Sequence, residues 1–221
     1  VEAWGFGLKN RENMNREKVD SLLPLIGFEK VKLENGRIIK SNPKIRIDYN
    51  AIAQGYSVDV LGGFLERGGI ENYLVDIGGE VLARGTKPTN QRWLVGIEKP
   101  AEEANSNREV RATVEITNRA VATSGSYRKY YEIDGVKYSH TIDPHSGYPV
   151  QHSLLSATVV SDSAAIADAW ATAFMVMGLE KARNYLENHP DMEAYFIYSD
   201  SAGNYKSWMT ENLKNMVREN N

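Results

Sequence analysis

The sequence predicts an α+β fold in which mixed, largely antiparallel sheets pack against isolated helices. Short apolar segments flank the dipeptides Asn35-Gly36 and Asp134-Gly135, which favour the positive φ angles of a two-residue hairpin turn. Segments with the apolar spacing of helices stand singly among these hairpins, whereas a doubly wound parallel sheet would alternate strand and helix regularly. A length of 221 residues is enough for one large domain or two lobes with a sizeable core.

The chain begins with a predicted helix over residues 13–26, in which apolar side chains recur at helical spacing. Residues 28–33 and 37–40 are the two strands predicted for the first hairpin. Residues 45–48 alternate between apolar and polar side chains, and this pattern predicts a further short strand.

A second helix is predicted over residues 51–66, preceded by a cap that begins at Asp48. Its large apolar side chains recur every four residues, which predicts a stripe facing the core. The members of this stripe are Ile52, Tyr56, Val60 and Phe64.

The rest of the chain predicts further strands and two helices, of which the first is the most apolar of the chain and has its cap at residues 161–163. In order, these are strands at 73–77, up to 83, 93–98 and 111–117, a Thr-Ser-Gly-Ser turn at 123–126, hairpin strands at 130–133 and 136–138, a strand at 153–160, helices at 164–177 and 179–188, a hairpin of 195–198 and 205–208, and a short amphipathic tail.

The composition excludes several classes of function. A net charge of −3 without any basic run argues against a nucleic-acid partner and against polybasic membrane binding. No apolar run has the length of a transmembrane helix, and the absence of Cys excludes disulfides and thiol chemistry. The sequence starts at Val1 without a leader or an initiating Met, so we expect further chain upstream.

A polar loop after the predicted 136–138 strand contains the first candidate for chemistry. His140 stands at the end of this strand, and Thr141 and Asp143 follow it before Pro144 turns the chain. A histidine at a strand end that faces hydroxyls and backbone N–H groups is suited to act as a general base. The alternative is an ordinary surface histidine.

The apolar helix predicted over 164–177 contains a candidate cation site. Asp168 and Thr172 lie four residues apart, so they share one face of the helix. A carboxylate inside an apolar helix is costly to bury alone, and Mg²⁺ bound to its hard oxygens would remove that cost. The alternative is that Asp168 pairs with an Arg or caps a neighbouring strand.

Two glycine-containing segments could bring the backbone close to a ligand. Gly78 and Gly79 follow a predicted strand, and the segment 51–55 offers free N–H groups at a helix start. Each pattern is also typical of an ordinary turn or helix start.

Taken together and in order, five motifs resemble those of the FAD:protein FMN transferase family, the ApbE-type flavin transferases. The motifs cover about residues 48–178 and are Asp48-Tyr49-Asn50-Ala51-Ile52-Ala53-Gln54-Gly55-Tyr56-Ser57-Val58-Asp59, Asp76-Ile77-Gly78-Gly79-Glu80, Ala122-Thr123-Ser124-Gly125-Ser126-Tyr127, Ser139-His140-Thr141-Ile142-Asp143-Pro144 with Ser146-Gly147 and Pro149, and Asp168-Ala169-Trp170-Ala171-Thr172-Ala173.

The resemblance implies an enzyme that binds FAD and Mg²⁺ and transfers FMN to a Ser or Thr hydroxyl of an acceptor protein, releasing AMP. It implies that Asp168, Thr172 and a backbone carbonyl of Ala51 bind the metal, and that His140 is the base. It also implies a single catalytic domain of two lobes, residues 1–221, with the FAD site between them. The residues expected to line that site are Gln54, Asp76, Gly78, Gly79, Glu80, Ser124, Gly125, Thr141 and Asp143.

Two departures from the family pattern leave alternatives open. Gln54 stands where many relatives have Lys, and the family's N-terminal Ser-Glu-Ile/Val-Ser-x-x-Asn region is absent from this sequence. The alternatives are hydrolysis of FAD to FMN and AMP, and binding of FAD without catalysis. The resemblance further implies export, to the periplasm or to a membrane as a lipoprotein.

Overall fold

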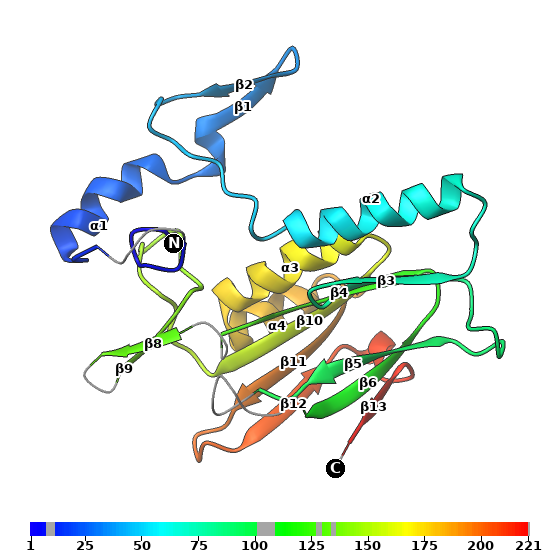
Figure 1. Cartoon of the computed structure of the whole chain (residues 1–221). Helices are drawn as coiled ribbons and strands as arrows, with labels where there is room; N and C mark the ends of the chain where they lie inside the picture. Colours follow the sequence, from blue (N-terminus) through cyan, green and yellow to red (C-terminus); the bar gives the residue numbers. More distant parts are fainter. Residues whose placement is uncertain (8–11, 101–108, 127–129, 134–135, 221) are drawn as a thin grey trace. The chain divides into compact units, whose positions relative to one another are not determined.

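The structure is a computed structural model, and it describes residues 1–7, 12–100, 109–126, 130–133 and 136–220. The chain forms two compact units (Figure 1). The first unit consists of Val1–Asp48 and Lys129–Gln151, and the second of Tyr49–Arg128 and His152–Asn221. Helices and antiparallel strands both occur, so the α+β prediction is confirmed. Whether the flavin site lies between two lobes stays a prediction.

The first unit contains a short helix and two antiparallel hairpins. Its elements are α1 (Arg16–Leu22), the 3₁₀ turns η1 (Leu23–Leu25) and η2 (Phe28–Lys30), and the strand pairs β1 (Val31–Glu34) with β2 (Arg37–Lys40) and β8 (Tyr130–Ile133) with β9 (Val136–Ser139). Both predicted hairpins are therefore confirmed, although the turn Asp134-Gly135 lies outside the described residues. The helix is shorter than predicted, because it becomes a 3₁₀ turn where Pro24 cannot donate a helical hydrogen bond.

The strand predicted at residues 45–48 is wrong. None of the strands that the structure describes pairs with this segment, and the carbonyl of Ile45 accepts a hydrogen bond from Lys40 Nζ at 2.7 Å instead. Alternation of apolar and polar residues favours a strand only where a second backbone is available for pairing.

The second unit is built around a six-stranded antiparallel sheet with the order β12-β11-β10-β7-β4-β3. Its strands are β3 (Tyr73–Ile77), β4 (Glu80–Arg84), β7 (Arg119–Gly125), β10 (Leu154–Ser161), β11 (Glu193–Ser199) and β12 (Tyr205–Met209). A second sheet contains β5 (Trp93–Glu98), β6 (Val110–Ile116) and β13 (Val217–Glu219), and a 3₁₀ turn η3 (Glu211–Leu213) precedes β13. The predicted amphipathic tail thus forms an edge strand.

Helices cover one face of the six-stranded sheet, and the three-stranded sheet covers the other (Figure 1). The helices are α2 (Ala53–Arg67), α3 (Ala164–Met177) and α4 (Leu179–Glu187). Side chains alternate along a strand, so neighbouring residues of β7 point to opposite faces of the six-stranded sheet. Val121 packs toward the three-stranded sheet, and Ala122 packs toward α3 and α4. None of the helices that the structure describes has the length and apolarity needed to cross a membrane.

The Thr-Ser-Gly-Ser turn predicted at 123–126 is also wrong. Residues 123–125 complete β7, where Thr123 and Ser124 are paired with Thr158 and Ala157 of β10. Pairing with β10 outweighs the turn preference of Ser and Gly.

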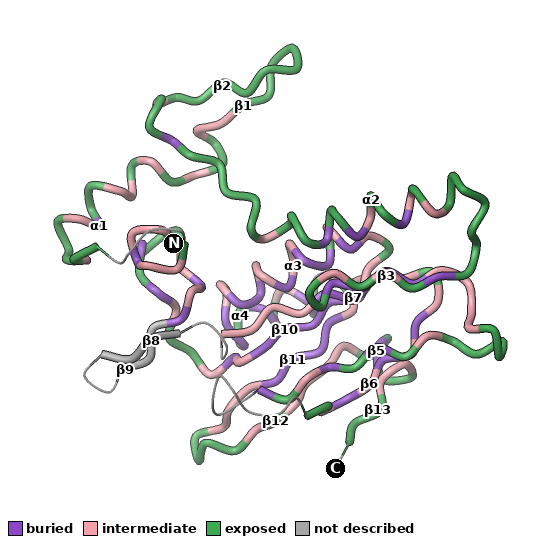
Figure 2. Tube along the Cα trace, in the orientation of Figure 1, coloured by how far each residue is buried: buried purple, intermediate pink, exposed green. Residues whose placement is uncertain are grey.

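The predicted inward face of α2 is wrong as well. Tyr56 and Phe64 are 62% and 65% exposed, and the buried positions are Gly55, Val58 and Gly62 (Figure 2). Helix α2 approaches α3 so closely that a Cβ atom on Gly55 would lie 2.3 Å from the carbonyl oxygen of Ala164. Small residues therefore define the packed face, and the large ones point outward.

Candidate functional site

The carboxylate of Asp59, in the second turn of α2, is bonded to the N-terminal end of α3. Asp59 Oδ2 accepts hydrogen bonds from Ser163 Oγ at 2.7 Å and from the backbone N–H of Ala165 at 3.0 Å, and Oδ1 accepts from Ala164 N–H at 2.8 Å. Asp59 thereby occupies N–H groups that a helix start leaves without intrahelical partners. This contact fixes the relative position of the two predicted motifs that contain Gln54 and Asp168.

Asp168 lies in the interior of α3 and is only 6% exposed. Its Oδ2 accepts a hydrogen bond from the backbone N–H of Gly55 at 3.2 Å, in the first turn of α2. Desolvation raises the pKa of the Asp168 carboxyl, and the Gly55 N–H lowers it in part. No Lys or Arg within the described ranges forms an ion pair with Asp168, so the Arg-paired alternative is not the one observed.

Thr172 lies one helical turn after Asp168 and meets the central strand of the sheet. Its Oγ1 is 3.0 Å from Ser124 Oγ on β7, and either hydroxyl can be the donor. Because β7 continues to Gly125, the predicted Ser-Gly pair lies at the end of a strand beneath α3. The structure thus brings Ser124, Asp168 and Thr172 to one place.

The turn between β3 and β4 lies beside the start of α2. Gly78 has φ +68°, a conformation that disfavours a side chain, and a Cβ on it would lie 2.3 Å from Nε2 of Gln54, whose side chain would have to move. Asp76 Oδ1 accepts from the Gly79 N–H at 3.0 Å and closes the turn. Gln54 Nε2 is 3.5 Å from the carbonyl oxygen of Ile77, at the limit of a hydrogen bond.

Glu80 follows this turn as the first residue of β4. The charge of Asp168 acts on its carboxyl group, and its Oε2 atom is buried without a hydrogen-bond partner. The second unit therefore gathers all predicted site residues that it contains around the beginnings of α2 and β4 and one face of α3, although no bond links Ala51 itself to Asp168.

The donor set at this place fits Mg²⁺. It consists of the carboxylates of Asp168 and Glu80 and the hydroxyl of Thr172, and a hard dication prefers such oxygen ligands. Within the described parts of the chain, neither this place nor any other brings three His, Cys, Asp or Glu side chains together into a metal-binding group, so the Thr172 hydroxyl and backbone oxygens would have to complete the ligand set.

The predicted His140 loop belongs to the first unit. His140 follows β9 directly and is half-buried, with its ring edge-on to Phe6 at a centroid distance of 6.3 Å. The loop is closed by a bridge between Ile142 and Pro149, and the Trp4 indole N–H donates to the carbonyl oxygen of Gly147 at 2.9 Å.

Asp143 and Thr141 stabilise this loop from within. Asp143 Oδ1 accepts from His145 N–H at 2.9 Å, and the buried Thr141 accepts from Val150 N–H through its carbonyl oxygen. Burial acts to raise the pKa of Asp143, but hydrogen bonds from the His145 N–H and from Ser146 outweigh it and lower the pKa. The imidazole is thus carried by an ordered loop.

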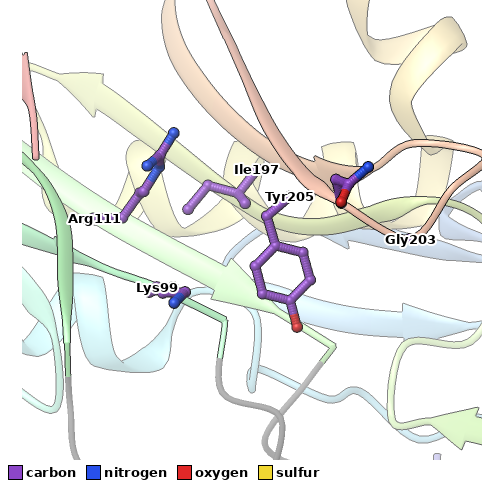
Figure 3. Close-up of a pocket in the computed structure, with 6 residues that line it drawn as sticks. Lys99, Arg111, Ile197, Gly203 and Tyr205 are labelled. Atoms are coloured by element: carbon purple, nitrogen blue, oxygen red, sulfur yellow. The ribbon is translucent and has the colours of Figure 1, made fainter. Parts of the chain in front are cut away.

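A separate cavity of about 400 Å³ contains none of the predicted residues (Figure 3). It is lined by Lys99, Arg111, Ile197, Gly203, Asn204 and Tyr205. Its cations have acidic neighbours, since Lys99 pairs with Glu109 at 3.3 Å and the charge of Arg111 acts on Glu219. This balance of charge gives no reason to assign the function to this cavity.

The sequence-based predictions do not include the long-range contacts that several supporting residues make. Asp59 and Gly55 act on residues more than a hundred positions away, and Trp4 acts on a loop 143 positions away. The predicted cap at Ser163 is the one local signal in this region, and Ser163 does accept from Ile166 N–H. The contacts of Asp59, Gly55 and Trp4 are with residues far away in the sequence, so no local sequence pattern predicts them.

Comparison of the sequence with known proteins relates this chain to one family. The ApbE family matches residues 1–196. The FAD:protein FMN transferase of Escherichia coli K12 is 35% identical and is covered over 64% of its length by 100% of this chain. The corresponding protein of Vibrio cholerae O395 is 39% identical, with 97% of this chain and 63% of that protein covered.

Solved structures give the same result. The apo form of the Pseudomonas stutzeri flavinyl transferase ApbE has a TM-score of 0.84 and 34% identity over 97% of this chain and 66% of that chain. The flavin transferase ApbE from Vibrio cholerae has a TM-score of 0.84 and 33% identity, with coverages of 96% and 67%. This chain spans about 64% of the length of the E. coli relative.

Proposed function

Because this chain belongs to the ApbE family, we propose that it transfers the FMN half of FAD to a Ser or Thr hydroxyl of an acceptor protein and releases AMP. The observation that carries the proposal is the buried Asp168 carboxylate, which shares a helix face with Thr172 and has no organic cation beside it in the described chain. A buried carboxylate without such a partner is suited to a metal ion.

In this proposal, Asp168, Thr172 and the Ala51 carbonyl hold Mg²⁺. When bound, Mg²⁺ neutralises charge on the pyrophosphate of FAD. The residues proposed to line the FAD pocket are Gln54, Asp76, Gly78, Gly79, Glu80, Ser124, Gly125, Thr141 and Asp143. The backbone turn at Gly78 supports close approach of a ligand, because no side chain stands there.

The proposed reaction joins the acceptor oxygen to the phosphorus of the FMN half and breaks the bond between that phosphorus and the oxygen that leaves with AMP. The hydroxyl proton must be removed, and His140 is the base that we propose for this step. A neutral imidazole is a suitable acceptor near neutral pH. The ordered loop and the edge contact with Phe6 support this role, because a base acts best when its ring is held in one orientation.

The transfer is tested by incubating the protein with FAD, Mg²⁺ and a candidate acceptor, and by measuring covalent flavin fluorescence on a denaturing gel. We expect His140→Ala to lower the rate about 10²–10⁴-fold, the usual contribution of a general base. His145→Ala is the matched control, because this exposed histidine lies in the same loop and its hydrogen bond to Asp143 comes from its backbone N–H, which alanine keeps. Equal rates for the two variants would contradict the assignment of His140.

Product chromatography separates the proposal from its two alternatives. Free FMN and AMP, formed equally with and without acceptor, would identify a hydrolase, and bound FAD without any AMP would identify a flavin-binding protein. Export to the periplasm, or anchoring as a lipoprotein, is part of the same proposal. Recovery of the full-length protein from the cytosolic fraction would contradict it.

A further inference from the structure

Glu80 has an environment that the role of a pocket-lining residue does not explain. Its side chain is only 7% exposed, and its Oε2 atom is buried without a hydrogen-bond partner. Leaving a buried carboxylate oxygen unsatisfied is costly, so such an atom requires a partner that the protein itself does not provide.

The strand register determines where Glu80 points. Side chains alternate along β4, and Val81 and Ala83 pack toward the three-stranded sheet. Leu82 packs with Val58 of α2 and Ala164 of α3 on the opposite face. Glu80, two residues before Leu82, therefore faces the helices, on the side where Asp168 and Thr172 of α3 lie.

The protein groups around Glu80 leave its charge unbalanced. Gln54 Nε2 and Glu80 Oε2 lie 2.3 Å and 3.9 Å from the point that a Cβ on Gly78 would occupy. The Gln54 amide beside this turn is neutral, and it is directed at the carbonyl oxygen of Ile77. The charged groups that act on Glu80 are the carboxylates Asp168 and Asp76. No Lys or Arg of the described residues forms an ion pair with Glu80.

A divalent cation would give the Oε2 atom of Glu80 a partner. It would also offset the electrostatic repulsion between the carboxylates of Glu80 and Asp168. We propose that Glu80 contributes a carboxylate oxygen to the same cation as Asp168 and Thr172, so that the site contains two acidic ligands instead of one. A second carboxylate increases the charge complementarity of the site and allows it to hold the cation before FAD arrives. This inference rests on the proposed function only for the location of the metal site.

The inference is tested by titrating the intact chain with Mn²⁺ in the absence of FAD, with free Mn²⁺ measured by electron paramagnetic resonance. We expect Glu80→Gln and Asp168→Asn each to raise the Kd for Mn²⁺ by about tenfold or more, as loss of a metal-site partner commonly does. Glu187→Gln is the matched control, because it removes one negative charge from an exposed position of α4. Its Kd should stay within about twofold of that of the intact chain, because exposed charges are screened by salt.

Thermal unfolding distinguishes a ligand from a residue that merely stabilises the fold. Mg²⁺ should raise the Tm of the intact chain and should raise that of Glu80→Gln much less. Without divalent cations, the Glu80→Gln variant should melt above the intact chain, because a neutral amide has a smaller desolvation cost than a carboxylate. An unchanged Mn²⁺ affinity in Glu80→Gln, or no uptake of Mn²⁺ by the intact chain at millimolar concentrations, would overturn the inference.

These measurements separate the inference from the proposed function. Mn²⁺ binding that depends on Glu80, in a protein that neither transfers FMN nor releases AMP, would support the inference and contradict the function. If the protein transfers FMN but its Glu80→Gln variant binds Mn²⁺ as tightly as the intact chain, the proposed function is supported and the inference about Glu80 is contradicted.

Discussion

At the scale of single residues, burial changes the acid–base behaviour of Glu80. Desolvation, and to a smaller extent the charges of Asp168 and Asp76, raise the pKa of its carboxyl group to about 7, although a hydrogen bond from its own backbone acts in the opposite direction. An exposed glutamate has a pKa of 4.5. In the absence of metal, the folded chain therefore binds a proton at Glu80 more tightly than the unfolded chain does.

The stability of the metal-free chain should consequently depend on pH. The contribution of Glu80 to the free energy of unfolding is fully present below pH 4.5 and is lost as the pH rises through about 7. The loss amounts to at most about 3.5 kcal/mol, because one pKa unit corresponds to about 1.4 kcal/mol. Urea unfolding of the intact chain and of Glu80→Gln, with a chelator present, measures the difference. If both lose the same free energy between pH 5 and 7, Glu80 does not titrate as described.

At the scale of elements, the packing of α2 on α3 depends on the absence of a side chain at Gly55. A Cβ at this position would lie 2.3 Å from the carbonyl oxygen of Ala164 and 2.8 Å from the Cα of Ala165, and neither backbone atom can rotate away. The same glycine donates its N–H to Asp168, so a displaced α2 would also disturb the candidate metal site.

Gly55→Ala should therefore destabilise the chain, by about 1–3 kcal/mol as for other overpacked positions. Gly63→Ala in the same helix is the control. Its Cβ would have the flexible end of Arg67 as nearest neighbour, at 3.3 Å, and alanine gains about 0.5–1 kcal/mol over glycine within a helix. Chemical denaturation should thus give changes of opposite sign for the two variants. A neutral Gly55→Ala would show that α2 does not pack on α3 as the structure has it.

At the scale of the whole molecule, α2 presents an apolar surface to solvent. Its exposed members are Tyr56, Val60, Leu61 and Phe64, and the exposed Ile52 directly precedes the helix (Figure 2). Clusters of exposed large apolar residues are uncommon on monomeric proteins and promote association. This chain also spans about two thirds of its relatives, with 66% of the P. stutzeri structure matched.

Phe64→Ser should reduce concentration-dependent light scattering of the isolated chain and change its Tm little, because exposed side chains contribute little to folding stability. Val58→Ser, at a fully buried position of the same helix, is the control and should cost several kcal/mol. A large loss of Tm in Phe64→Ser would mean that this side chain is covered in the folded chain.

The sequence by itself determined the features that depend on neighbouring residues. The hairpins around Asn35-Gly36 and between β11 and β12 follow from turn chemistry and strand propensity, and α3 follows from its apolar spacing and its cap at Ser163. Placing Asp168 and Thr172 on one helix face likewise needs only the helical repeat. The motif order was sufficient to indicate the ApbE family, to which the chain belongs.

The tertiary structure alone decided the features that depend on partners distant in the sequence. Residues 123–125 became part of a central strand because β10 lies beside them, and residues 45–48 did not form a strand because no neighbour was available. The buried side of α2 was decided by how closely α3 approaches Gly55. The unpartnered oxygen of Glu80 has the same origin, since the register of β4 and the placement of α3 determine what a buried carboxylate meets, and neither can be read from its sequence neighbours.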